Sequence, residues 1–486
     1  MFAPGVEEAL PFVVATLGTP TVVAEPTPQM LLVAAQEKPH EPIAVPRLPL
    51  PAHVRMIDLA GALASAGADN PTIALAEEAV RVTLAERMQA RALLLPTLDA
   101  GTNLRSHQGT VVTGRGVVTD TDIRSLYWGA GADAKGTGTV AVPGVRLVSH
   151  LGDAYFAPKA AQRKVVQSQF AAAATRQYLL MEVGIRYLAL VEAQARQQAY
   201  RQSLSEFEEI ERLTAGFAKA KQGRQADADR AKSEAMLLRA EMERAAEAVE
   251  TAAAEMARLL DWDPSMPLRS VEVVPPMLEL VGKSHSLSAL LDQAVSEHPE
   301  VVARAADVAF FEIRVRQEKL RPLLPVIAVG FSAGAYGGSG ANTESRLGHF
   351  SARTDLDIAA IWSLPNAGVG NRALQNLART GLESALIEHA RTIDRIRREV
   401  TEAYALVETR RQEITFAGRR TETSQQAFTE ELARAKNLKA LPIELLRIAN
   451  QLAEARQDLV RAITGFSQAQ LQLYAALGNT PVVTAR

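Results

Sequence analysis

The sequence predicts a mainly α-helical protein with a smaller β component, arranged as two tandem repeats of helix–helix–strand–strand–long helix–helix. Three observations support this prediction. Similar short motifs recur in the same order in both halves of the 486-residue chain. Each half contains a helical stretch far longer than the roughly 8–20 residues of an ordinary globular helix. Each half also contains Gly-rich segments in which apolar and polar residues alternate, as in β-strands.

The composition excludes several classes of protein. Lys plus Arg is 53 and Asp plus Glu is 55, a net charge of −2. This balance argues against a nucleic-acid binder, which would need a basic surplus. The chain has no cysteine, which excludes disulfides, thiol catalysis and Cys-ligated metals. Aromatic residues are only 5%, which favours extended helices over a dense globule. No run reaches the roughly 20 apolar residues of a membrane-spanning helix.

Residues 1–56 are rich in proline and are expected to form a disordered extension. The apolar stretch 9–24 contains Pro11 and Pro20, and no Lys or Arg precedes it. A standard secretory signal has a positive start and an unbroken apolar core. We therefore expect that the N-terminus is not a standard signal or that the true start of the gene product differs from Met1.

The first repeat is expected to cover residues 57–260. It starts with two helices that stop at Asn70-Pro71 and Leu95-Pro96. A long helix then opens at Pro158 and contains no further proline before a break near Gly216 and Gly223. In chain order, the expected elements are helices over 57–70 and 72–94, strands over about 97–108 and 139–155, and helices over 158–216 and 227–260.

The second repeat follows a Pro-containing linker, 261–285, covers 286–480 and leaves a short tail, 481–486. Its His298-Pro299 and Leu324-Pro325 pairs match the pairs that end the first two helices. Both long helices carry Glu-Val-x-x-x-Tyr, starting at Glu182 and Glu399. Strands are expected over about 325–337 and 350–363, and a helix break is expected at Leu441-Pro442.

The alternating segments each have two chemically different faces. One face carries apolar residues such as Leu98, Leu104, Val329 and Leu356. The other is polar and charged; its candidate residues are Asp99, Arg105, His107, Arg146, His150, Arg353, Asp355 and Asp357. A soluble antiparallel sheet with one solvated face would give this pattern. So would strands of a transmembrane barrel, which need about 9–11 such residues.

Four strands per chain do not close a barrel, and a bilayer does not tolerate open sheet edges. Three chains would supply twelve strands, which can close, so the barrel interpretation implies a trimer. The long helices would then continue as a tube. Their heptad-like apolar spacing fits a coiled-coil rod equally well.

Both helix breaks are expected at the end of the molecule remote from the strands. Asp227, Asp229 and Glu444 follow these breaks. Acids near a helix start usually serve the cap and the helix dipole. A ring of carboxylates that narrows a channel mouth is the alternative.

The ordered set of motifs resembles the TolC-like outer membrane efflux proteins. The resemblance rests on the twofold repeat, the Pro-bounded helix pairs, the Glu-Val-x-x-x-Tyr helices and the strand-to-helix segment from Trp362 to Gly370. The closing Gln470-Leu471-Gln472-Leu473-Tyr474 and the residues after it also look like this family. The resemblance covers about residues 57–480.

The resemblance implies a homotrimer with a twelve-stranded β-barrel in the outer membrane and a continuous periplasmic α-helical tunnel. Such a trimer contacts outer-membrane lipid and passively exports cargo that an inner-membrane pump delivers through a periplasmic adaptor. It needs no catalytic residue, cofactor or metal and has no nucleic-acid partner. The polar strand face would line the lumen, Trp362 would lie at the periplasmic membrane interface, and loops at about 109–138 and 338–350 would face outward.

The resemblance also implies that the helical tips close the tunnel and contact the adaptor. The corresponding residues are Phe217, Lys221, Gly223, Arg224, Asp227, Asp229, Lys436, Leu438, Lys439 and Glu444. The tip glycine of the family is present as Gly223, but Leu438 stands near the equivalent place in the second half.

Two other classes of protein fit the sequence less well. An enzyme is disfavoured because Gly368-Val369-Gly370 lacks the third glycine of a dinucleotide loop and no His-x-x-x-His pair is present. Asp355 and Asp357 could be an acid pair, but Arg353 beside them favours a solvated or lumen-facing charge cluster. A non-membrane coiled-coil scaffold explains the long helices but not the two strands that interrupt each repeat.

Overall fold

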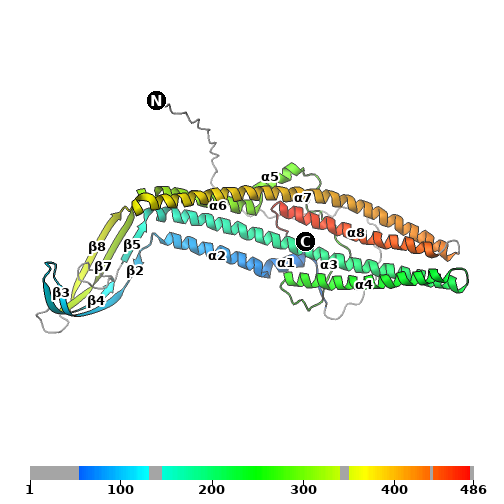
Figure 1. Ribbon diagram of the computed structural model, residues 1–486, viewed down its shortest axis with the longest axis horizontal. Coiled ribbons are helices and arrows are strands. Elements are labelled where there is room, and N and C mark those ends of the chain that lie inside the picture. Colours follow the sequence, from blue (N-terminus) through cyan, green and yellow to red (C-terminus); the bar gives the residue numbers. More distant parts are fainter. Residues whose placement is uncertain (1–53, 131–144, 340–349, 438–441, 482–486) are drawn as a thin grey trace, which may run out of the picture.

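The computed structural model describes residues 54–130, 145–339, 350–437 and 442–481. The molecule is elongated, with a β-sheet at one end and long helices that run away from it toward two helical turns at the other end (Figure 1). Within the described residues, every helix is too short or too polar to cross a bilayer.

The helices of the two halves follow the same order. The first half contains α1 (Leu59–Asp69), α2 (Pro71–Ala92), α3 (Leu151–Lys219) and α4 (Gln225–Leu259). The second contains α5 (Leu287–Glu297), α6 (Pro299–Leu320), α7 (Val369–Lys436) and α8 (Pro442–Ala476). α3 and α7 have 69 and 68 residues, which corresponds to on the order of 100 Å each.

The starts of α2 and α6 are fixed by the same device. The Asn70 side chain accepts a hydrogen bond from the Thr72 amide at 2.8 Å, and His298 Nδ1 accepts one from the Glu300 amide at 3.2 Å. Each cap precedes a proline at the first helical position, where its missing N–H costs nothing. α6 continues into a 3-10 turn, η1 (Arg321–Leu323).

α3 and α7 are continuous, whereas the shorter helices cover them in two successive stretches. α2 and then α4 pack along α3, and α6 and then α8 pack along α7 and also contact α3. Apolar clusters hold α1 to α3 through Leu63, Val183 and Tyr187 and α5 to α7 through Leu290 and Val400. A further cluster, which includes Phe207, Phe428 and Leu445, joins the helices near the turns.

The sheet is antiparallel and is centred on β7 (Val326–Ser339), which pairs with β8 (Phe350–Ile361) on one side. Its other side pairs first with β5 (Val145–His150) and then with β4 (Val118–Ala130). β2 (Thr97–Leu98) pairs with β5, and β3 (Gly101–Val112) pairs with β4. The six segments therefore lie along four lines in the sheet: β2 and β3 share one line, β4 and β5 share the next, and β7 and β8 form one line each. Separately, β1 (Arg55–Ile57) pairs in parallel with β6 (Leu268–Ser270).

The strands of the first repeat differ from the expected ranges. The second strand was expected over about 139–155. In its place the structure has β4, which begins at Val118, and β5, which ends at His150; residues 139–144 lie outside the described residues. The loop expected at about 109–138 contains the end of β3 and all of β4. A tight turn joins them, with the Thr113 amide donating to the Val117 carbonyl at 2.9 Å and Gly116 at φ +77°. In the second repeat, β7 and β8 lie close to their expected ranges.

α3 starts earlier than expected, at Leu151 instead of Pro158. His150 Nδ1 accepts a hydrogen bond from the Gly152 amide at 3.0 Å and ends the strand there. Pro158 lies inside the first turns of the helix. α1 starts later than expected, after Ile57, because the Asp58 carboxylate caps it by accepting from the Gly61 amide at 2.8 Å.

Candidate functional site

The strand registers place the predicted polar residues on one face of the sheet, here called the polar face. Arg146 is paired with Gly330, and Gly330 with Asp357, so all three share a face. Arg353 and Asp355 follow on the same strand at a period of two. His150 pairs with Val326 on this face. The register also assigns Arg105 and His107 to it, through partners on β4. Asp99 falls between Thr97 and Gly101, which belong to the same face.

The opposite, apolar face exposes large side chains to the surroundings. Leu98 is 75% exposed, Leu104 68%, Leu356 65% and Ile358 72%. Trp128 and Phe331 on this face are also exposed. On the polar face, Ser125 and Ser332 are buried. A contiguous exposed apolar surface of this kind marks contact with lipid or protein.

A glycine of the central strand, Gly330, lies between two charged residues of the polar face. Arg146 and Asp357 flank Gly330, whose position has no other heavy atom within 4 Å of a built Cβ. Nearer the start of the same strand, β8, Arg353 Nε donates to Asp355 Oδ2 at 2.9 Å. Ser332 Oγ lies 3.4 Å from the same oxygen. The face therefore carries neighbouring charges of both signs.

An ion-pair cluster that was not predicted joins the start of α3 to the end of α6 and to η1. Arg321 donates through Nη2 to Asp153 Oδ1 at 2.6 Å and through Nε to Glu318 Oε2 at 2.7 Å. Gln317 Nε2 donates to the same Asp153 oxygen at 2.6 Å. Glu318 and Gln317 are buried, so the cluster fixes the start of α3 against the end of α6.

Trp362 follows the end of β8 and is 62% exposed. Its Nε1 donates to the Leu323 carbonyl at 3.3 Å, across to the end of η1. The chain then passes through η2 (Pro365–Gly368) into α7. Asn366, Ala367 and Gly368 all have positive φ there, so the strand-to-helix segment turns through a left-handed conformation.

The turn between α3 and α4 brings together the predicted tip residues of the first repeat. The amides of Gln222 and Gly223 donate to the Phe217 carbonyl, and Lys221 has φ +56°. A Cβ at Gly223 would lie 3.1 Å from Phe217 Cβ, which is a tight contact, so the turn favours glycine at this position. Arg224 is exposed and caps α4 through its backbone, without a side-chain cap. Asp227 lies in the first turn of α4.

The second turn is described in part. Asp229, on α4, accepts a hydrogen bond from Gln225 Nε2 at 3.0 Å. After the second break between helices, Glu444 lies in the first turn of α8. Lys436 Nζ lies 3.2 Å from Glu209 Oε1 of α3, so it links the two hairpins. Leu438 and Lys439 lie outside the described residues.

Arg456 was not predicted as a candidate, although it joins three helices. Its guanidinium donates to both oxygens of Glu206 on α3 at 2.8 Å and to Gln425 Oε1 on α7 at 2.7 Å. The Arg456 residue is 8% exposed. Its sequence context, a charged residue among alanines of an amphipathic helix, is that of a surface position. Only the rotation of α8 against α3 identifies it.

The described part of the chain contains no group of three or more His, Asp or Glu side chains that could hold a metal ion. The charged residues of the sheet and the tips instead form dispersed pairs along an elongated surface. Such an arrangement can line a path or a contact surface.

The fold is that of TolC-like outer-membrane channels. No protein-family model matches the sequence, and no curated protein matches it. A membrane protein from Pseudomonas aeruginosa has a TM-score of 0.71 at 20% identity, covering 91% of this chain and 98% of that chain. The outer-membrane channel OprN has 0.69 at 16%, covering 89% and 98%. The Campylobacter jejuni outer membrane channel CmeC has 0.70 at 13%, covering 89% and 94%. The mainly helical fold with a smaller β-sheet, expected from the sequence resemblance, is therefore confirmed.

Proposed function

We propose that three copies of this chain form a channel in the outer membrane of a two-membrane bacterium. The three sheets join into a twelve-stranded barrel, and the helices continue it as a periplasmic tunnel. Cargo passes through by diffusion, with no chemical step. An inner-membrane pump supplies the cargo, and a periplasmic adaptor connects the pump to the helical tips.

The sheet carries this proposal. Among the described strands, β8 and the β2–β3 line each pair on one side only, and the bilayer does not tolerate a free edge. Joining β8 of one copy to the β2–β3 line of the next satisfies both edges. The apolar face then contacts lipid, and the polar face, with Asp99, Arg146, Arg353 and Asp357, lines the lumen.

The helices support the same assembly. α2 and α7 form the two lateral edges of the helical layer beside the sheet, and both expose apolar residues. On α2 these are Leu75, Val82 and Met88, and on α7 they are Val369, Leu377 and Ile387. Packing α2 of one copy on α7 of the next would cover both rows.

The tips are assigned to closure of the tunnel and to adaptor contact. In this proposal Lys221, Gly223 and Arg224 form the first contact surface, and Asp227, Asp229 and Glu444 narrow the mouth. The exposed, basic turn 219–224 supports a contact with an acidic or polar partner surface.

The test is to purify the full chain from outer membranes in detergent and insert it into a planar bilayer. A trimeric mass and discrete conductance steps from the same sample are the expected result. A monomeric, non-conducting species would contradict the channel and favour a coiled-coil scaffold.

A further inference from the structure

Part of the linker between the two repeats, residues 268–281, is fixed across the helices and is here called the strap. It begins with β6, which pairs with β1. The Ser270 amide donates to Gln194 Oε1 of α3 at 2.9 Å. Further along, the Leu278 amide donates to Ser467 Oγ of α8 at 3.0 Å. The strap therefore crosses from one helical hairpin to the other and is held on both.

The inner side of the strap is buried against the helices. Leu268 and Leu278 are buried. Between them, the Glu272 carboxylate accepts a hydrogen bond from the Tyr187 hydroxyl, and Tyr187 itself lies in the apolar core of the first repeat. These contacts prevent the strap from rolling over to bury its other side.

The outer side of the strap is apolar and exposed. Val271 is 56% exposed, Val274 59% and Met277 54%. Val273, and Met56 of the neighbouring strand β1, are exposed as well. An exposed apolar row on a segment that cannot turn inward is typical of a contact surface.

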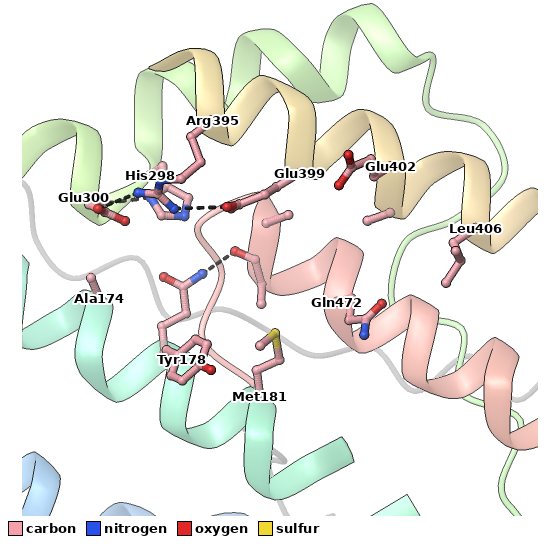
Figure 2. A pocket seen from close by; sticks show the side chains of 14 residues that line it. Ala174, Tyr178, Met181, His298, Glu300, Arg395, Glu399, Glu402, Leu406 and Gln472 are labelled. Carbon is pink, nitrogen blue, oxygen red and sulfur yellow. Dashed lines mark hydrogen bonds and ion pairs between the residues drawn. The ribbon is translucent and has the colours of Figure 1, made fainter. Parts of the chain in front are cut away.

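The strap is separate from the cavity of about 450 Å³ shown in Figure 2. Gln470 Oε1 accepts from the Leu280 amide of the strap at 3.1 Å, whereas Gln472 lines the cavity with Tyr178 and Met181 of α3. At about 100° per residue, Gln472 is turned by about 200° from Gln470 around α8. The strap and the cavity therefore lie on different sides of this helix.

The N-terminal segment, residues 1–53, is tethered beside this apolar row. The described part of the chain begins at Val54, two residues before the exposed Met56. The Ile57 carbonyl accepts from the Val271 amide at 2.9 Å, so the strap starts where β1 ends. A segment on so short a tether has an effective concentration in the millimolar range. This favours the N-terminal segment over a second copy or another protein as the occupant of the row.

The last part of the N-terminal segment has the composition and the length to cover the row. Residues 43–50 carry four apolar side chains, Ile43, Val45, Leu48 and Leu50. The prolines at 46 and 49 disfavour a helix, and eight extended residues span on the order of 25 Å. The strap spans about 20 Å at most between Val271 and Met277. Residues 51–53 are left to reverse the direction of the chain.

We propose that residues 43–50 pack on the outer side of the strap of their own chain and cover its valines and Met277. The extension expected from the sequence to be disordered is then ordered over this part, and it clamps the linker between the two repeats. All of these residues belong to one chain, so neither the proposed trimer nor channel activity is needed for the contact.

Thiol labelling tests the contact in the full chain, purified in detergent, after its intact mass has shown that residues 43–50 are present. The chain has no cysteine, so Val273→Cys introduces a single thiol. A maleimide should react with it about tenfold more slowly than in a chain that also carries Ile43→Ser, Val45→Ser, Leu48→Ser and Leu50→Ser. The matched control is Lys283→Cys, an exposed position on the same linker beyond the strap. Its labelling rate should be the same with and without the four serines.

Disulfide formation identifies the chain that supplies the segment. Leu48→Cys combined with Val273→Cys should form an intrachain disulfide on oxidation and keep the mass of a single chain in denaturing conditions. Leu48→Cys combined with Met266→Cys should form much less disulfide. Met266 is also exposed and precedes Pro267, whose carbonyl accepts from the Arg55 amide, so an undocked segment would reach it as readily.

Four outcomes would overturn the proposal. The first is equal labelling of Val273→Cys with and without the four serines; protection in both chains would mean that another occupant covers the strap. The second is an equal rise in labelling at Val273→Cys and Lys283→Cys. The third is a disulfide-linked dimer, which would assign the segment to a neighbouring copy. The fourth is a disulfide yield with Met266→Cys as high as with Val273→Cys. None of these outcomes bears on the conductance test of the proposed channel.

Discussion

Asn70 and His298 occupy equivalent positions before α2 and α6, but only His298 can change its charge. Burial holds the pKa of His298 below its usual value; Glu300 opposes this effect and Arg395 adds to it. The neutral ring is also the form that can accept from the Glu300 amide through Nδ1. Folding therefore favours the unprotonated side chain.

This pKa shift predicts a pH-dependent stability. Below the unfolded pKa of about 6.5, the unfolded chain binds more protons than the folded chain, so stability falls as pH falls. His298→Asn keeps a capping side chain and removes the titration. We expect the variant to lose less stability than wild type between about pH 7.5 and about pH 5, with a difference of on the order of 1 kcal/mol. Thermal unfolding at both pH values measures it, and parallel curves for the two proteins would contradict the assignment.

Single residues were predicted unevenly from the sequence. The caps before Pro71 and Pro299 could be predicted because the Asn-Pro and His-Pro pairs are local signals. Gln177 and Arg456 could not, because Ala475, the partner of Gln177, and Glu206, a partner of Arg456, lie on other helices more than 200 residues away along the chain. Their roles depend on how each helix is rotated.

Between elements, the Arg456–Glu206 pair predicts a strong coupling of α8 to α3. The two side chains are 9% and 16% exposed, so removing one partner leaves a charge that is poorly solvated. Arg456→Met should destabilise the protein by about 3 kcal/mol. The double variant Arg456→Met with Glu206→Met should recover most of this loss. Denaturant unfolding of both variants provides the measurement; a double variant no better than the single one would show that the packing, not the charge, matters.

Neighbouring residues of β8 allow a test of the two sheet faces. Leu356 lies on the apolar face and Asp355 on the polar face. Leu356→Arg should destabilise membrane-inserted protein by about 2–4 kcal/mol if the residue is near the bilayer midplane. Asp355→Asn should change the conductance and leave assembly intact. Folding yields in vesicles, compared with single-channel currents, would expose a wrong face assignment if both variants assembled equally well.

The strands of the second repeat were easier to predict than those of the first. β7 and β8 alternate cleanly, so their ranges follow from the period of two. In the first repeat, Asp120, Asp122 and Arg124 of β4 fall on the same side of the strand as the apolar Leu126 and Trp128. These charged residues weaken the alternation. The extent of β4 depends on its pairing with β3 and with β7. Because β7 is about 200 residues later in the chain, a local sequence pattern does not contain this pairing.

At the scale of the whole molecule, the exposed rows on α2 and α7 predict how copies meet. Leu377 on α7 is 71% exposed, and an aspartate there would place a charge in the proposed contact between copies. Leu377→Asp should shift the trimer toward monomer at a given concentration while leaving the helix content unchanged. Sedimentation and circular dichroism measure the two quantities.

The matched control for this variant is Ser205→Asp. Ser205 is an exposed position on α3, which is flanked by helices of its own chain. This variant should remain trimeric. Equal dissociation of both variants would mean that added charge alone, and not the α2–α7 contact, causes the effect.

The motifs and their order in the sequence were sufficient to predict the order of the helices, but not the short strands β1 and β6. The extent of the sheet could not be predicted in the same way, because strands from both halves of the chain pair with β7. Helix lengths were predictable from the absence of proline, whereas the helix starts depended on capping contacts.

Only α3 and α7 are continuous past the level where the shorter helices meet end to end. There Asn70 Nδ2 donates to the Leu259 carbonyl at the end of α4, at 2.8 Å, and Gly478 lies against His298. In the part of the chain that the structure describes, the short β1–β6 pair is the backbone ladder at this level, and no backbone hydrogen bond joins the ends of α4 and α8 directly to α2 and α6. The helices α4 and α8 therefore need not open together with α2 and α6. Amide hydrogen exchange should therefore divide the rod into two cooperative units that share α3 and α7, with the unit near the turns exchanging as a block of its own.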